Sequence, residues 1–299
     1  MKYNTRIAPS PTGDMHIGTA RTAYHNWLAA RATGGRFILR IDDTDAARNK
    51  PEYTKVITET MEWLGLDYDT LAFQSANFGF YKKKAEDFVA KGWAVEKDGA
   101  VHLKLPSDVP LPVKWNDEIS GDISITARDI ESTQGMVLIR SDGTPTYNWA
   151  SVWDDKLLEV NYIIRGTDHI TNTSKQAILW RLIGYDLPKF AHVGLIGVKG
   201  KPLSKREGAA SMLHYRNAGY DPDAMLNFLA RLGWGPKVDD KTTKMLPREK
   251  MLELFLTGGN LHNNLANLDM VKLESYDRKY KAAKKVWRTK ETLMDHDKG

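Results

Sequence analysis

The stretch PSPTGDMHIGT at residues 9–19 decides the fold of this chain. A short apolar-containing run at residues 5–8 precedes it and fits a buried strand. Apolar residues recur at helical spacing across residues 20–28, and Gly34-Gly35 ends that pattern. The sequence therefore predicts a strand, a rigid loop rich in proline and glycine, and a helix in succession, with His16 at the start of the helix.

The predicted loop has the properties of a phosphate-binding site. The N-terminus of a helix offers free N–H groups and a partial positive charge to an anion, and glycine lets the backbone come close to it. His16 would then lie beside the phosphate. A tight turn in which His16 only caps the helix is the alternative that this stretch alone leaves open.

A second motif far along the chain favours the phosphate interpretation. It reads GKPLSKREG at residues 200–208, a cationic loop bracketed by two glycines. A solvated surface loop would also explain its charges. The combination of PSPTG-x-x-HIG with a distal LSKR resembles the two ATP-binding motifs of the class I aminoacyl-tRNA synthetases, and within that class it is similar to the glutamyl-tRNA synthetases.

The resemblance continues between and beyond these motifs. Further stretches look like blocks of the family in the family's order: FILRIDDTD at residues 37–45, DGTPTYN at 142–148 and IRGTDH at 164–169. The likeness extends through residues 215–234 and covers residues 3 to about 280. It implies an α/β fold: a class I synthetase Rossmann-like parallel sheet, an inserted small α+β acceptor-binding module, and a short helical C-terminal stem-contact segment.

Four parts are expected along the chain. They are residues 1–92, the first half of the nucleotide-binding catalytic domain; 93–140, a shortened inserted acceptor-binding module without a zinc site; 141–235, the second half of the catalytic domain with the LSKR loop; and 236–299, a helical, basic, stem-contact-like segment. Full-length members of the family continue with a helical anticodon-binding region. We therefore expect the anticodon to be unread or read by another component. The basic end, which includes Tyr280 and Trp287, suits either phosphate contact or a solvated helix.

The resemblance assigns the chemistry to His16 and Lys205. Forming an aminoacyl-adenylate is an in-line attack of a carboxylate on the α-phosphate of ATP, so positioning and charge neutralisation supply most of the acceleration. His16 would stabilise charge on that phosphate, and Lys205 would neutralise the departing pyrophosphate. The implied ATP-binding residues are Pro9, Gly13, His16, Gly18, Thr19, Lys201, Leu203, Ser204, Lys205 and Arg206. Mg²⁺ is expected only as part of the ATP substrate complex.

The charges of the substrate can be matched to this chain. A guanidinium binds a carboxylate through two parallel hydrogen bonds and pairs less well with a neutral amide. The resemblance assigns the glutamate side chain to Arg6, Arg165 and Tyr147, with Arg165 excluding glutamine. It assigns the substrate ammonium to Ser10 and Asp42, where bacterial relatives usually have a glutamate, and Ala8 and Ser151 complete the implied substrate-binding residues. Arginines paired with local carboxylates and a core tyrosine are the alternatives.

Composition restricts the other chemistries. The chain has 299 residues, a formal net charge of +5 and no cysteine, which excludes disulfides and thiolate metal sites. Its eight histidines show no clustered ligand spacing, so we expect no zinc. A turn after a strand explains Asp43 and Asp45 as well as a metal site would. The sequence has no signal-like N-terminus and no apolar run of about 18 residues. We therefore expect a cytoplasmic protein, monomeric and without a membrane partner.

Three functions remain open at this point. The first is a glutamate–tRNA ligase that takes L-glutamate and ATP as substrates and recognises the acceptor arm of tRNA. The second is a glutamyl-queuosine tRNA(Asp) synthetase, and the third is a non-catalytic tRNA-binding paralogue. The second group usually keeps cysteines in the insertion and a glutamine where Arg206 stands, and the third would be expected to lose His16, Lys205 or Arg6. The resemblance therefore favours the ligase.

Overall fold

Two groups of parallel strands form the centre of the molecule. The computed structural model describes residues 1–45, 47–198, 200–202, 211–236, 245–255 and 257–296, with side chains up to residue 285 except that of Pro202. In the first group β1 (Thr5–Ile7), β2 (Phe37–Ile41) and β3 (Thr70–Phe73) pair in that order. In the second group β9 (Tyr162–Gly166) pairs with β10 (Lys189–Val193). The predicted parallel α/β sheet is confirmed.

The first helix begins and ends where the sequence predicts. α1 (Ile17–Thr33) follows the loop after β1, and His16 is its N-cap residue, with a ring nitrogen that accepts from the Thr19 N–H at 3.4 Å. Gly34 ends the helix in the left-handed region at φ 65°, a conformation that costs glycine little. The strand, loop and helix predicted around PSPTGDMHIGT are therefore confirmed.

The two strand groups meet at β1 and β9. The backbone N–H groups of Asn161 and Tyr162 donate to the carbonyl oxygen of Asn4, at 3.0 and 3.3 Å. Further along the strands, the buried side chain of Asn26 on α1 donates to the carbonyl of Ile164 at 2.8 Å and accepts from its N–H at 3.3 Å. The amide of Asn26 thus pairs with the backbone N–H and carbonyl of Ile164. Without it these buried groups would have no hydrogen-bond partner, which would cost folding free energy.

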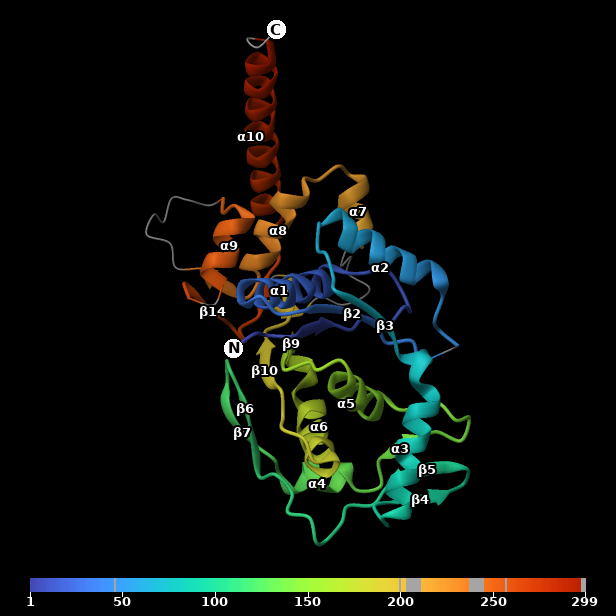
Figure 1. Cartoon of the computed structure of the whole chain (residues 1–299). Coiled ribbons are helices and arrows are strands. Elements are labelled where there is room, and N and C mark those ends of the chain that lie inside the picture. Colours follow the sequence, from blue (N-terminus) through green and yellow to red (C-terminus); the bar gives the residue numbers. More distant parts are fainter. Residues whose placement is uncertain (46, 199, 203–210, 237–244, 256, 297–299) are drawn as a thin grey trace.

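Helices cover both faces of these strands (Figure 1). α1 and α2 (Pro51–Trp63) lie on one side, and α3 (Phe78–Ala90), α5 (Tyr147–Leu157) and α6 (Ile170–Ile183) lie on the other. Two short 3-10 turns lead into α3 and α6: η1 (Gln74–Asn77) and η2 (Thr167–His169).

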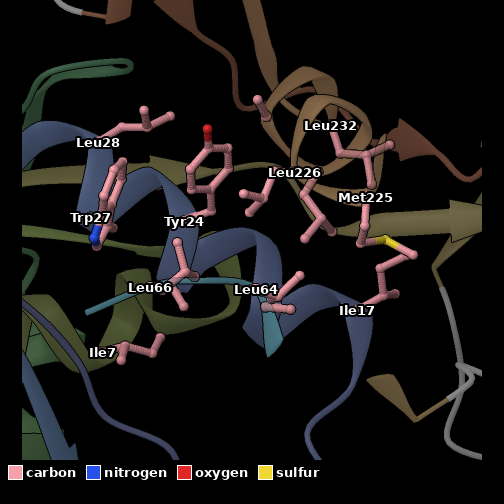
Figure 2. Close-up of a cluster of buried hydrophobic side chains, with 14 of the residues drawn as sticks. Ile7, Ile17, Tyr24, Trp27, Leu28, Leu64, Leu66, Met225, Leu226 and Leu232 are labelled. Atoms are coloured by element: carbon pink, nitrogen blue, oxygen red, sulfur yellow. The ribbon is translucent and has the colours of Figure 1, made fainter. Parts of the chain in front are cut away.

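Alternation along β2 divides the interior into two cores. Phe37, Leu39 and Ile41 belong to the core that includes α1, whereas Ile38 belongs to the core that includes α3, α5 and α6. Figure 2 shows part of the first core, in which Tyr24 of α1 lies near Leu226 from the C-terminal part of the chain. A strand buried on both faces explains why FILRI is almost continuously apolar.

Residues 93–140 contribute to two different sheets. One sheet is antiparallel, in the order β4-β5-β8, and stands apart from the central strands. A hairpin, β6-β7, instead extends the second central group, because β6 pairs in parallel with β10 through Asp117 and Phe190. The elements of this part are β4 (Ala94–Lys97), β5 (Ala100–Leu103), β6 (Lys114–Asp117), β7 (Gly121–Ser124), α4 (Ala127–Thr133) and β8 (Val137–Ile139). The division of the chain into four parts remains a prediction.

The last third of the chain packs on α1 and then extends away from it. α8 contacts α1 and α10, and α10 projects from the body (Figure 1). The elements are β11 (Ile196–Val198), β12 (Lys201–Pro202), α7 (Met212–Asn217), α8 (Pro222–Arg231), β13 (Trp234–Pro236), α9 (Arg248–Phe255), β14 (Gly259–Leu261), β15 (Ala266–Asn267) and α10 (Met270–His296). Within the described residues, no helix combines the length and apolar character needed to cross a membrane.

Two lysines of the basic end make ion pairs inside the protein. Lys281 pairs with Asp277 at 2.7 Å, and Lys284 pairs with Asp221 and Asp223, each at 2.8 Å. The Lys284 contacts attach the middle of α10 to the start of α8, whereas the Lys281–Asp277 pair lies within α10. The positive charge of these two side chains is therefore partly neutralised before any polyanion arrives.

Candidate active site

A cavity of about 500 Å³ opens near the ends of β1 and β9. After β1 the chain passes to α1 on one face of the sheet, and after β9 it passes to α6 on the other (Figure 1). Open α/β sheets bind ligands at such a switch point, outside the carboxyl ends of the strands. The lining residues are Arg6, Ile7, Ala8, Pro9, Ser10, His16, Gly18, Thr19, Arg21, Thr22, Asp42, Tyr147, Ile164, Arg165, Gly166, Asp168, His169, Leu195 and Ile196.

His16 is both a helix cap and a cavity residue. Its side chain contacts Thr19 twice, at the backbone N–H and at the hydroxyl, with Nε2 3.2 Å from Oγ1. A Cβ at Gly18 would lie 3.2 Å from the His16 ring, so a larger residue there would push the imidazole out of place. The ring therefore lies at the N-terminus of α1, beside Gly18 and Thr19, which also line the cavity.

The chain that follows the second motif, at Ser211 and Met212, lies beside the first motif. Ser211 forms an isolated β-bridge with His16, and the N–H of Met212 donates to the carbonyl of Met15 at 2.8 Å. Two stretches separated by almost 200 positions in the sequence are thus joined at the cavity. Leu203, Ser204, Lys205 and Arg206 lie outside the described residues.

Arg6 presents unpaired donors to the cavity. The residue is only 4% exposed, and its Nε donates to Asp155 Oδ1 at 3.1 Å. Within the described part of the chain, its Nη1 and Nη2 have no hydrogen-bond partner. Arg6 thus has a carboxylate partner, as the alternative expected, but Asp155 binds only Nε. Nη1 and Nη2 stay available to a ligand in the cavity.

Arg40 organises the carboxylates below the cavity. It binds Asp42 through Nε and Nη2, at 2.6 and 3.1 Å, and donates to Asp155 through Nη1 at 2.7 Å. Burial alone would raise the pKa of Asp155, but Arg6 and Arg40 outweigh burial and hold it below its usual value. Burial raises the pKa of Asp42, and Arg40 offsets only part of this effect. Asp42 thus lines the cavity with its carboxyl group held in one orientation by Arg40.

Arg165 is a buried arginine surrounded by neutral groups. It is 5% exposed on β9, and its Nε contacts His192 at 3.2 Å while Nη2 donates to Thr173 and Gln176 at 2.6 and 2.8 Å. Nη1 lies 3.4 Å from the hydroxyl of Tyr147. Among the residues that the structure describes, no carboxylate lies within ion-pairing distance of Arg165. Burial lowers its pKa, as expected for a cation without a counter-ion.

Most of the predicted residues come together in this cavity. Arg6, Ala8, Pro9, Ser10, His16, Gly18, Thr19, Asp42, Tyr147 and Arg165 line it. Gly13, Ser151 and Lys201 do not. Ser151 lies one layer behind, where its hydroxyl accepts from Arg40 Nη2 at 3.3 Å. The hydroxyl of Ser151 thus supports Arg40, and its predicted contact with the substrate stays a prediction.

Several residues of the site were not identified from the sequence. Arg40 had a signal, since it is the one charge inside the apolar strand FILRI and a buried charge needs a partner. Asp154 and Asp155 had a similar signal, as adjacent aspartates on a helix with a largely apolar sequence. Leu195 and Ile196 had no such signal in the sequence. Their neighbours in the chain do not distinguish two apolar residues that line a cavity from two that lie in a core.

The described residues contain no group of three or more histidine, aspartate or glutamate side chains that could hold a metal ion. Asp43 instead accepts from the N–H and the hydroxyl of Ser75, at 2.8 and 2.6 Å. Asp45 pairs with Arg48. Both aspartates thus have structural partners next to the cavity.

Comparison with known proteins agrees with the geometry. The family model described as "tRNA synthetases class I (E and Q), catalytic domain" matches residues 2–99 and 95–275. The chain is 47% identical to glutamate–tRNA ligase 2 of Neorickettsia sennetsu over 235 residues, which cover 78% of this chain and 56% of that protein. It is 42% identical to glutamate–tRNA ligase 1 of Helicobacter hepaticus over 294 residues, 85% of this chain and 61% of that protein.

A solved structure shows the same fold. The crystal structure of a glutamate tRNA ligase from Elizabethkingia meningosepticum in complex with its amino acid superposes with a TM-score of 0.77 at 26% identity. The match covers 94% of this chain and 70% of that chain. The matches to the two curated relatives named above span less than two thirds of the length of those proteins, 56% and 61%.

Proposed function

Because the chain belongs to the class I tRNA synthetases of the glutamate and glutamine group, we propose that it activates L-glutamate with ATP and transfers it to tRNA. The observation that carries the proposal is the pair of buried guanidiniums at the cavity. Arg6 is paired on one side with Asp155 and offers two unpaired nitrogens, and Arg165 has no carboxylate within ion-pairing distance among the described residues. A bound carboxylate would compensate the burial of Arg165 and could also bind the remaining nitrogens of Arg6.

Glutamate matches the distribution of charge around the cavity. Its side-chain carboxylate would bind between Arg6 and Arg165, with the Tyr147 hydroxyl beside them. Its ammonium would bind near Asp42, whose carboxylate Arg40 keeps in place. Glutamine would leave the buried guanidinium of Arg165 without a negative partner, so we propose that Arg165, together with Arg6, selects the acid over the amide.

The α-carboxylate would then point toward the N-terminus of α1, where ATP would bind as its Mg²⁺ complex. A carboxylate oxygen forms a bond to the α-phosphorus while the bond to the bridging oxygen breaks, and pyrophosphate leaves with that electron pair. His16 and the N–H groups at the start of α1 would stabilise the charge on the α-phosphate. Lys205 is proposed to neutralise the leaving pyrophosphate.

Transfer to tRNA completes the proposed reaction. A hydroxyl of the terminal ribose attacks the acyl carbon, loses its proton, and AMP leaves. We propose that residues 93–140 contact the acceptor end, because the β4-β5-β8 sheet stands apart from the central strands and offers a separate surface. Aminoacylation of an acceptor-stem minihelix and of whole tRNA, measured side by side, tests this part: comparable kcat/KM supports it, and an inactive minihelix contradicts it.

The experiment that tests the activity is ATP–pyrophosphate exchange with and without tRNA. Glutamate should support exchange and glutamine should not, and Arg165→Gln should weaken the glutamate signal. Arg181→Gln is the matched control, because this arginine is exposed and its side chain makes a single hydrogen bond among the described residues, to the carbonyl of Pro110. A chain that shows no exchange with glutamate under either condition would contradict the proposal.

The queuosine alternative has less support, since both curated relatives named above are glutamate–tRNA ligases. Periodate treatment of tRNA(Asp) before the reaction separates the two. Periodate destroys the terminal ribose diol, so glutamate incorporation that survives it would place the amino acid on the modified base and overturn charging at the 3′ end.

A further inference from the structure

Asp117, His192 and Arg165 form a row across three neighbouring strands. β6, β10 and β9 are adjacent in that order, and His192 is the register partner of Arg165. Asp117 Oδ2 accepts from the N–H of His192 at 2.9 Å and from its ring Nδ1 at 2.7 Å. His192 Nε2 lies 3.2 Å from Arg165 Nε. His192 is fully buried, and Asp117 is 1% exposed.

The contacts determine which nitrogen of His192 carries the proton. Asp117 Oδ1 also accepts from the N–H groups of Ile119 and Ser120, at 3.0 and 2.9 Å. Burial would raise the pKa of Asp117, but these hydrogen bonds and His192 hold it below its usual value, so it is a carboxylate. A carboxylate requires a proton on Nδ1. Nε2 must then keep its lone pair, because Arg165 Nε can only donate to it. The Thr173 hydroxyl, which lies 2.9 Å from the same nitrogen, can also donate to that lone pair.

The row leaves one edge of Arg165 for a ligand. His192 takes Nε, and Thr173 and Gln176 take Nη2. The remaining nitrogen, Nη1, lies toward Tyr147 and the cavity that both residues line. Because His192 is a neutral acceptor, it orients the guanidinium without cancelling its charge. A carboxylate in its place would orient the group equally well but neutralise it before the substrate arrived.

From this geometry we propose that His192, fixed in one tautomer by Asp117, is a positioning residue that sets the preference for glutamate over its amide. It acts through Arg165 and does not touch the substrate. The proposal rests on the proposed function, since it takes Arg165 to bind the glutamate side chain. It also adds a role for residues 114–124: Asp117 ends β6 and so connects that hairpin to amino-acid recognition.

Two isosteric variants separate positioning from simple packing. The amide of His192→Gln reaches the position of Nε2 and can still accept from Arg165, whereas the amide of His192→Asn reaches only the position of Nδ1 and Asp117. In glutamate-dependent exchange, His192→Asn should raise the KM for glutamate roughly tenfold or more and reduce the preference over glutamine. Its KM for ATP should stay unchanged. His192→Gln should remain within about threefold of the parent chain on each measure.

The outcomes distinguish the possibilities. An unchanged glutamate KM in His192→Asn, or equal losses for glutamate and ATP in both variants, would overturn the proposal. Failure of the parent chain to exchange with glutamate would instead count against the proposed function. The tautomer is tested without activity by the ¹⁵N spectrum of the His192 ring at pH 7, assigned with His192→Gln. A neutral ring protonated at Nδ1 is expected, and one protonated at Nε2, or an imidazolium, would overturn the proposal.

Discussion

Asn26 on α1 pairs with both backbone groups of Ile164 on β9, its amide nitrogen donating at 2.8 Å and its amide oxygen accepting at 3.3 Å. At the junction of β1 and β9, the side chain of Asn26 therefore makes the two hydrogen bonds that the backbone of a neighbouring strand would otherwise make. Next to this junction the two strands separate and the cavity opens, with Ile164 itself among the lining residues. One buried amide thus supports the position at which the ligand would bind.

Asn26→Ala should lower the free energy of unfolding by about 2–4 kcal/mol, because it leaves the buried N–H and carbonyl of Ile164 without partners. Urea denaturation monitored by tryptophan fluorescence measures the change. Asn116→Ala is the control, since its amide makes one exposed hydrogen bond to Asp122 and its loss should cost less than about 0.5 kcal/mol. Equal effects of the two substitutions would contradict the role of Asn26.

His16→Ala and Lys205→Ala should each lower the rate of ATP–pyrophosphate exchange at least about tenfold, a loss of about 1.4 kcal/mol of transition-state stabilisation. Binding of glutamate should change little, because both residues are assigned to phosphate groups. His102→Ala, on β5 and outside the cavity lining, is the control. Parent-like exchange by either variant in the presence of tRNA would show that the catalytic assignment is wrong.

Arg165→Gln should reduce the preference for glutamate over glutamine. The variant loses the charge that favours a carboxylate, and a neutral amide no longer faces a buried cation without a partner. Competition between the two amino acids in one exchange assay gives the ratio of their kcat/KM values. A ratio equal to that of the parent chain would place Arg165 outside the recognition of the substrate side chain.

The free energy of unfolding should decrease as the pH drops below 6.5, in part because His25 stays neutral in the folded protein. Burial lowers the pKa of His25 to about 3, and its Nε2 contacts the carbonyl of Ala230 at 3.0 Å. The unfolded chain binds a proton at this residue from about pH 6.5 downward while the folded chain does not. The free energy of unfolding therefore decreases by about 1.4 kcal/mol per pH unit for this group between those two values.

His25→Gln should remove that share of the slope when urea denaturation is repeated between pH 7 and 4.5, because a glutamine amide can still donate to Ala230. Leu28→Ala, on the same helix and fully buried, should lower stability by about 2–5 kcal/mol without changing the slope. A His25→Gln variant with the slope of the parent chain would contradict the assignment.

The sequence by itself determined the elements around the first motif and most of the cavity residues. The positions of proline and glycine and the apolar periodicity act over about one helix and its neighbouring strand, so β1, the loop and α1 could be predicted locally. The resemblance to a known family then pointed to Arg6, His16, Asp42, Tyr147 and Arg165, all of which line one cavity. These predictions needed only short stretches and their order along the chain.

Only the tertiary structure decided the partners of the buried charges. Asp155 lies 149 positions from Arg6, and Asp117 lies 75 positions from His192. Which carboxylate meets which arginine depends on strand order and register, and a shift of one residue would turn each side chain to the other face. No local pattern contains that information. A neighbouring carboxylate could have neutralised Arg165, and the fold instead places His192 beside it, with no carboxylate within ion-pairing distance among the described residues.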